Sequence, residues 1–218
     1  MAQAGYASAP PQAGVDVGYL QSVLDALCDI SLRDPLTGLA NRRYFMSVLE
    51  QELDRVARSG EMALLLMVDI DFFKKVNDTH GHLVGDLVIK QIAQAILQSV
   101  RPMDTVARFG GEEFAVILPS CQPAFAAVVA ERIREKVEST PIPLDSGEVL
   151  RSTVSCGGAF APQWVRSNVA AWIERADAQL YVAKKTGRNR VCIEPQPEST
   201  VTAEEKSLLF GLVPGEPQ

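Results

Sequence analysis

The feature that most constrains the fold is a pair of strand-like runs separated by two glycines. The runs cover residues 105–109 and 112–118, and Gly110 and Gly111 stand between them. Two consecutive residues that can take positive φ favour a tight hairpin turn. The second run opens with two glutamates. The sequence therefore predicts an antiparallel strand pair with an acidic tip.

A second acidic cluster follows an apolar strand. The run 63–68 leads directly into Asp69 and Asp71, and an adjacent strand could bring Glu112 and Glu113 beside them. Magnesium is usually held by one or two carboxylates together with substrate phosphates, so two acidic clusters on neighbouring strands suit it. The simpler alternative is that the aspartates are solvated turn residues. The combination of the two clusters favours a metal site.

The order of the expected elements predicts an α+β fold. Helices are expected at 41–59, 84–99, 123–139 and 169–185, and further strands at 152–160 and 190–193. The resulting order β-α-β-β-α-β is that of a split βαβ sheet with helices packed against one face. No internal repeat is visible.

Both ends of the chain differ in composition from its centre. Residues 1–14 are expected to be a disordered head, 15–33 an amphipathic helix that forms a short stalk, and 34–194 the folded domain. The tail 195–218 is expected to be mostly flexible. Within it, 202–213 places two glutamates ahead of five large apolar side chains, which favours a short helix docked on its own domain or on a partner protein.

Composition excludes several classes of function. The net charge of −6 gives no basic field for a nucleic-acid backbone. The longest apolar runs have seven residues, whereas a membrane span needs roughly 20, so no membrane span is expected. The N-terminus lacks the features of a secretory signal, and the four cysteines have no paired spacing, which favours buried reduced thiols. We therefore expect a cytoplasmic protein.

Polar residues near the first strand suit a nucleotide. Backbone N–H groups in the expected loop 72–82 can bind phosphate oxygens. Guanine presents two adjacent donors that fit one carboxylate such as Asp86, while Asn77 can both donate and accept. Lys184 and Arg188, four apart at the end of a helix, could reach a triphosphate. The alternatives are helix caps, turns and cations at a helix C-terminus.

Five ordered segments together resemble the diguanylate cyclases of the GGDEF family. They are DPLTGLANRRYF (34–45), DIDFFKKVNDTHGHLVGD (69–86), RFGGEEF (108–114), VSCGGA (154–159) and ADAQLYVAKKTGRNRV (176–191). The resemblance spans about residues 34–193. It implies a palm domain like that of nucleotidyl cyclases, in agreement with the predicted element order.

The resemblance also implies a reaction. Two GTP molecules would give cyclic di-GMP and two pyrophosphates, with one GTP bound by each domain of a facing homodimer. Two Mg²⁺ (or Mn²⁺) ions per active site would be the cofactors. Asp69 and Glu112 would bind metal together with the Ile70 carbonyl. Glu113 would bind the second metal or help to deprotonate the 3′-hydroxyl, and Lys74 would join Glu112 and Glu113 in the catalytic set.

The resemblance places further residues on the substrate and on the product. Asn77 and Asp86 would read guanine. The groups implied to hold phosphates are the amides of Phe72 and Phe73 and the side chains of Lys74, Lys184 and Arg188. Arg101 lies nine residues before the first glycine of the hairpin, and with Asp104 it resembles the family's RxxD inhibitory site for cyclic di-GMP. Arg132 resembles the second arginine of that site; the alternative for the RxxD pair is an ordinary surface ion pair.

Two other functions compete with an active cyclase. One is a domain that has lost catalysis and senses GTP or receives cyclic di-GMP, although such domains usually have damaged motifs and here both acidic motifs are intact. The other is a cyclase or polymerase that acts on another nucleotide. Asn77 and Asp86 favour guanine, because a carboxylate facing adenine would meet ring nitrogens that only accept.

Overall fold

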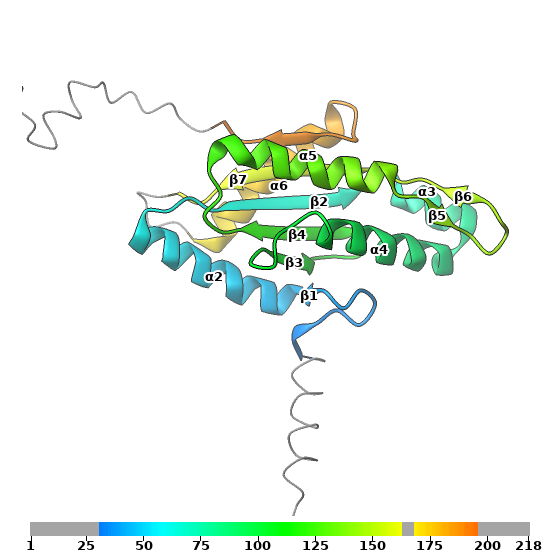
Figure 1. Ribbon diagram of the computed structural model, residues 1–218, viewed down its shortest axis with the longest axis horizontal. Helices are drawn as coiled ribbons and strands as arrows, with labels where there is room; N and C mark the ends of the chain where they lie inside the picture. The colour runs from blue at the N-terminus through cyan, green and yellow to red at the C-terminus, as the bar shows by residue number, and fades with distance from the viewer. Residues whose placement is uncertain (1–30, 163–167, 196–218) are drawn as a thin grey trace, which may run out of the picture.

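The computed structural model describes residues 31–162 and 168–195 (Figure 1). The expected head, nearly all of the stalk helix, and the tail beyond residue 195 with its docking helix lie outside these described residues. Within them, no helix is both long enough and apolar enough to cross a membrane. Cys121 and Cys156 are free and buried, as expected, while Cys192 is free and half-buried. Cys28 lies outside the described part.

The centre of the fold is a six-stranded sheet in the order β1-β3-β4-β2-β7-β8. Its strands are β1 (Ala40–Asn41), β2 (Leu64–Ile70), β3 (Thr105–Arg108), β4 (Glu113–Leu118), β7 (Val154–Phe160) and β8 (Val191–Ile193). The central strand β2 runs antiparallel to both β4 and β7. A separate two-stranded ribbon pairs β5 (Ile142–Pro143) with β6 (Val149–Leu150).

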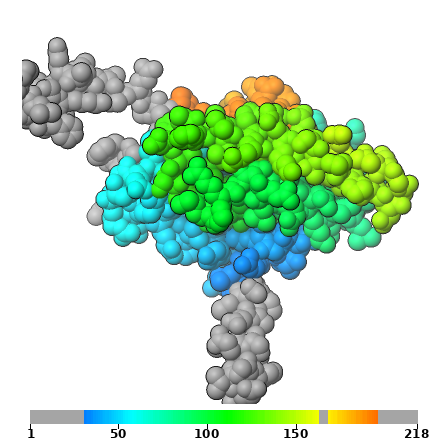
Figure 2. Space-filling view, in the orientation of Figure 1, coloured from blue at the N-terminus to red at the C-terminus, as the bar shows by residue number. Residues whose placement is uncertain are grey.

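Helices cover both faces of the sheet. They are α2 (Arg42–Ser59), α3 (Phe73–His80), α4 (His82–Leu97), α5 (Pro123–Ser139) and α6 (Val169–Lys185). Leu66 and Val68 of β2 pack with α4 and α5, whereas Leu65 and Met67 pack with α2 and α6. Figure 2 shows α4 and α5 covering the face turned to the viewer. The expected α+β class is confirmed. The prediction that helices pack against only one face of the sheet is wrong. Every residue of β2 is buried, and a strand whose two sides are both buried needs helices on both faces of the sheet.

One close contact fixes α6 on the sheet. A Cβ on Gly157 of β7 would lie 2.0 Å from the backbone nitrogen of Leu180 in α6, so only glycine allows the helix to lie this close. The contact places the last turn of α6 near the end of the neighbouring strand β2. That end carries the acidic residues.

The hairpin forms, but its turn differs from the expected one. β3 ends at Arg108 and β4 begins at Glu113, so four residues connect them, and neither Gly110 nor Gly111 has a positive φ. The amides of Phe109 and Gly110 both donate to the Glu113 carbonyl. The expected two-residue turn is therefore wrong. A Cβ on Gly110 would lie 2.4 Å from Oε2 of Glu113, so a larger residue there would displace that carboxylate.

The segment expected as a loop after β2 is mostly helical. Residues 73–80 form α3, and Gly81, with φ of 81°, separates it from α4. Phe72 precedes α3 in the left-handed region, with φ of 57°. The prediction of a loop at 72–82 was thus wrong, because Phe73 is buried and anchors the helix to the core.

Candidate active site

Adjacent strands bring the two acidic clusters together at one end of the sheet. Asp69 of β2 stands opposite Glu113 of β4 in the antiparallel register. The Ile70 amide donates to the Glu112 carbonyl over 3.3 Å. The four residues expected to bind metal, Asp69, Ile70, Glu112 and Glu113, therefore lie on two paired segments. This part of the expected site follows directly from the strand register.

The carboxylates at this end repel one another. Burial raises the pKa of Asp69 above its ordinary value, and Glu113 and Asp71 raise it further, while a hydrogen bond and the charge of Lys184 oppose the rise. The pKa of Glu112 is also raised, first by burial and then by the charge of Asp69. Lys184 Nζ lies 2.8 Å from Asp69 Oδ2. One cation therefore faces a group of acids that would be stabilised by more positive charge.

The donor atoms at this end fit a hard cation. They are carboxylate and carbonyl oxygens, which magnesium and manganese prefer. The described residues contain no ready-made cluster of three His, Cys, Asp or Glu side chains that could hold a metal ion. Magnesium commonly takes one or two protein carboxylates and completes its shell with water and substrate phosphates. The residues present fit an ion that is bound together with its substrate.

Asp71 has a different role from Asp69. It is buried and accepts hydrogen bonds from Thr153 Oγ1 at 2.7 Å, Ser155 Oγ at 2.6 Å and the Asn189 amide at 2.9 Å. These donors come from the start of β7 and from the α6–β8 loop. Asp71 therefore joins β2, β7 and that loop, and it positions the residue next to Arg188.

The residues expected to hold phosphates lie around Asp69. The guanidinium of Arg188 stacks on the exposed Phe72 ring, 4.4 Å from its centroid. Lys184 contacts Asp69 itself, and the amides of Phe72 and Phe73 lie at the N-terminus of α3, where backbone donors lack helical acceptors. Lys74 is exposed in the first turn of α3. Cations and amide donors thus border the acidic group.

The residues expected to read guanine lie where α3 packs against α4. Asn77 Oδ1 is buried and has no hydrogen-bond partner within the described structure. A Cβ on Gly85 would lie 1.9 Å from this atom, so the glycine makes room for the amide. Asp86, the next residue, is exposed. A buried acceptor without a partner is costly, which suits a site that a ligand completes.

Sequence reasoning gave no role to an ion pair that holds the hairpin. Arg108 Nη1 lies 3.2 Å from Asp34 Oδ2, and the same guanidinium donates to the Gly111 carbonyl from Nη2 at 2.8 Å. Asp34 also accepts from the amide and hydroxyl of Thr37. The turn that enters the domain is thereby tied to the hairpin tip. Asp34 begins the segment 34–45 and Arg108 begins the segment 108–114, both of which resemble the family. Charged residues without an assigned role in two such segments were the available signal for this pair.

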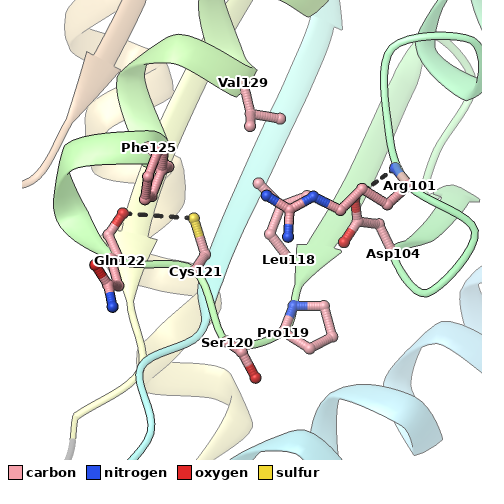
Figure 3. A pocket seen from close by; sticks show the side chains of 9 residues that line it. All are labelled: Arg101, Asp104, Leu118, Pro119, Ser120, Cys121, Gln122, Phe125 and Val129. Carbon is pink, nitrogen blue, oxygen red and sulfur yellow. Dashed lines mark hydrogen bonds between the residues drawn. The ribbon is translucent and has the colours of Figure 1, made fainter.

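The expected inhibitory residues lie at the opposite end of the β2–β4 strand pair. The Arg101 amide donates to Asp104 Oδ2 over 2.7 Å, and in Figure 3 the Arg101 side chain extends across a small pocket toward Cys121. Burial raises the pKa of Asp104, while Arg101 and Arg132 lower it. The pocket holds only about 20 Å³, room for little more than one water. A nucleotide would therefore lie across its opening.

Comparisons with known proteins identify the family. The family model "Diguanylate cyclase, GGDEF domain" matches residues 31–190. The response regulator PleD of Caulobacter vibrioides is 41% identical over 174 residues, which make up 79% of this chain and 38% of PleD. The chain thus matches well under half the length of that relative.

Solved structures agree with the sequence match. The coiled coil and GGDEF domain of DgcB from Caulobacter crescentus, solved in complex with c-di-GMP, matches with a TM-score of 0.78 and 36% identity, over 82% of this chain and 94% of that chain. The diguanylate cyclase SiaD from Pseudomonas aeruginosa, solved with its activator SiaC, matches with a TM-score of 0.74 and 38% identity, over 81% and 67% of the two chains. The family match takes in β2, the acidic hairpin and all of α6. This chain belongs to the GGDEF domain family of diguanylate cyclases.

Proposed function

We propose that this protein is an active diguanylate cyclase that condenses two GTP molecules into cyclic di-GMP and two pyrophosphates. The observation that carries the proposal is the group of mutually repelling carboxylates, Asp69 and Glu112, near Lys184 and Arg188 at one end of the sheet. Phosphoryl-type transfer asks mainly for positioning and for cations that neutralise developing charge. This end of the sheet supplies cations and carboxylates that could hold metal ions.

Asp69, Glu112 and the Ile70 carbonyl are the proposed ligands for two Mg²⁺ or Mn²⁺ ions, and Glu113 is either a ligand or the acceptor of the 3′-hydroxyl proton. The bound ions would neutralise charge on the triphosphate and on the attacking oxygen. Gly110 leaves space for the Glu113 carboxylate to fold back over the turn. That position keeps Glu113 beside the strand end.

The chain's own side chains would hold one GTP. Lys74, Lys184 and Arg188 would bind the phosphates, together with the amides of Phe72 and Phe73. The unpaired Oδ1 of Asn77 would accept a hydrogen bond from guanine. The Asp86 carboxylate would accept hydrogen bonds from the two adjacent guanine donors. Lys184 would exchange part of its contact with Asp69 for a phosphate oxygen.

Two such domains would have to face each other. The 3′-oxygen of each GTP forms a bond to the α-phosphorus of the other, the bond from that phosphorus to the pyrophosphate oxygen breaks, and the hydroxyl proton leaves to Glu113 or solvent. Residues 15–33, with apolar side chains at intervals of three and four, would serve as the stalk of the homodimer. The coiled coil that was solved together with the GGDEF domain of DgcB supports this role.

The deciding test is to incubate the purified protein with GTP and magnesium and to identify the product by chromatography. We expect a cyclic guanine dinucleotide and two pyrophosphates per product, with ATP unreactive in a parallel sample. Binding of GTP without turnover would contradict the proposal and support the alternative of a nucleotide sensor. Turnover of ATP at the rate of GTP would contradict the guanine assignment.

We also propose product inhibition through Arg101 and Asp104, with Arg132 as the second arginine. Arginine suits phosphates and guanine edges, and both arginines act on Asp104. In Arg101→Ala, calorimetry should show a weaker second binding site for cyclic di-GMP, and accumulated product should no longer slow turnover. Unchanged affinity and unchanged inhibition would mean that the motif is only a surface pair.

A further inference from the structure

A groove of about 470 Å³ lies between α3 and the residues that join β6 to β7. Lys75, Thr79 and His80 line it from α3, and Arg151 and Ser152 line it from the other side. Figure 1 shows α3 next to the β5–β6 ribbon at this end of the molecule. The volume falls in the range of small-molecule sites.

The groove is separate from the proposed guanine site. Successive residues of a helix are about 100° apart, so Lys75 and Thr79 lie on the side of α3 nearly opposite to Lys74 and Asn77. Asn77 lies against Gly85 of α4, whereas Lys75 and Thr79 line the groove. One helix therefore presents one face to the proposed guanine site and another to the groove, while Phe72, which precedes α3, lines the groove and belongs to the proposed phosphate site.

The groove carries cations without partners. Among the described residues, the side chains of Lys75 and Arg151 form no hydrogen bond or ion pair. The one acidic residue that lines the groove is Asp71, whose oxygens already accept three hydrogen bonds. The positive charge of Lys75 and Arg151 is thus available to an anion.

A buried hydroxyl in the same groove also lacks a partner. Ser152 is 7% exposed, and its Oγ makes no hydrogen bond within the described structure. Leaving such a group unpaired is costly, and a ligand oxygen in the groove would pair it. Free cations and a free hydroxyl are the combination that binds a phosphate group.

We propose that this groove is a second anion site that binds a small molecule through a phosphate or diphosphate group held by Lys75, Arg151 and Ser152. Asp71 borders the groove and also fixes the loop that carries Arg188. A ligand in the groove would therefore lie next to the element that positions the proposed triphosphate site. The site does not depend on the proposed cyclase activity, because it is defined by binding alone.

The experiment is an amide NMR titration of the protein with inorganic pyrophosphate, and in parallel with GMP, without divalent metal. The Ser152 and Thr153 amides report on the groove, and the Gly110 and Gly111 amides report on the acidic hairpin. We expect saturable shifts at Ser152. Tighter binding of pyrophosphate would indicate a free anion as the ligand, and tighter binding of GMP a nucleotide.

Three variants test the assignment. Lys75→Ala combined with Arg151→Ala should weaken binding at Ser152 at least about 10-fold, as expected for losing charge-assisted hydrogen bonds. Lys90→Ala, a matched removal of an exposed lysine from α4, should leave it unchanged. Ser152→Ala should weaken binding without lowering the melting temperature, because the hydroxyl has no partner to lose. No saturable shift at Ser152, or equal affinity in the double variant, would overturn the proposal.

Discussion

Asp69 lies near the end of β2 and Asp71 directly follows that strand, yet their surroundings differ in kind. Asp71 accepts three hydrogen bonds from neutral donors in two other segments. Asp69 has one lysine partner, and its pKa is raised first by burial and further by the neighbouring carboxylates Glu113 and Asp71. A carboxylate surrounded by donors is structural, whereas one held among acids costs folding energy. The difference shows that residue type and spacing indicate where a site lies, whereas the surrounding side chains determine which aspartate is available to a ligand and which one stabilises the fold.

The sharpest way to test this comparison is to remove the charge from the acidic group. Asp69→Asn and Glu112→Gln should each lower cyclic di-GMP formation at least ~100-fold, the lower end for loss of a group that stabilises transition-state charge. Both variants should remain folded, because each removes a repulsion between carboxylates. Asp69→Asn also loses the ion pair with the partly exposed Lys184, which should cost no more than about 1 kcal/mol. Turnover and circular dichroism measure the two effects. Glu50→Gln, an exposed charge removal on α2, is the control; near-normal turnover by a folded Glu112→Gln would sink the metal assignment.

Asp71 should show the reverse behaviour. Asp71→Ala leaves three donors without their acceptor, and hydrogen bonds to charged groups are each worth about 1.5–3 kcal/mol, so the free energy of unfolding should fall by about 3 kcal/mol or more. Urea unfolding of this variant beside Asp69→Ala measures the contrast. Equal losses of stability in the two variants would contradict the assignment of a structural role to Asp71 and not to Asp69.

The fold was largely predictable because its signals are local. The apolar run before Asp69, the Pro123 helix start and the 169–185 helix depend on periodicity within the chain, and the last two have the predicted bounds. The helix at 73–80 was missed because its short polar sequence resembles a turn, and its anchor, Phe73, is a single buried residue. Cover on both sheet faces was missed because it depends on long-range packing.

The candidate site divides in the same way. The sequence predicted that a neighbouring strand could bring the two acidic clusters together, and the register between β2 and β4 places Asp69 opposite Glu113. The donors to Asp71 come from residues more than 80 positions away, and the tie between Asp34 and Arg108 spans 74 positions. No local pattern reports contacts of this kind. The sequence therefore indicated which groups carry the chemistry but not which groups hold them in place.

A smaller effect is expected where α3 meets α4. Gly85→Ala would place a Cβ 1.9 Å from Asn77 Oδ1 and so displace the amide. The KM for GTP should rise about 10-fold, the effect of losing one hydrogen bond to the base. Two effects on stability oppose each other: alanine favours a helix interior by about 1 kcal/mol over glycine, and the new Cβ would crowd Asn77 and the Phe73 ring, 3.2 Å away. The melting temperature should therefore change little. Steady-state kinetics on GTP and ITP would reveal the change, and Ala95→Gly on the same helix gives a folding control. An unchanged KM would separate Asn77 from substrate binding.

The smallest expected effect is a pH dependence that belongs to Glu112. Burial and Asp69 raise its pKa in the folded protein above the ordinary value of 4.5. Between the ordinary pKa and the raised pKa of the folded protein, the folded state binds the proton more readily than the unfolded state. The contribution of Glu112 to stability therefore falls as pH rises through the folded pKa. Glu112→Gln should therefore melt higher than wild type at pH 7 and equally below the ordinary pKa. The gain should be less than about 1 kcal/mol, or no more than about 3 °C, because solvent screens this partly exposed carboxylate.

Magnesium should raise the melting temperature of wild type at pH 7 more than that of the variant, and an equal rise in both proteins would mean that the ion binds elsewhere.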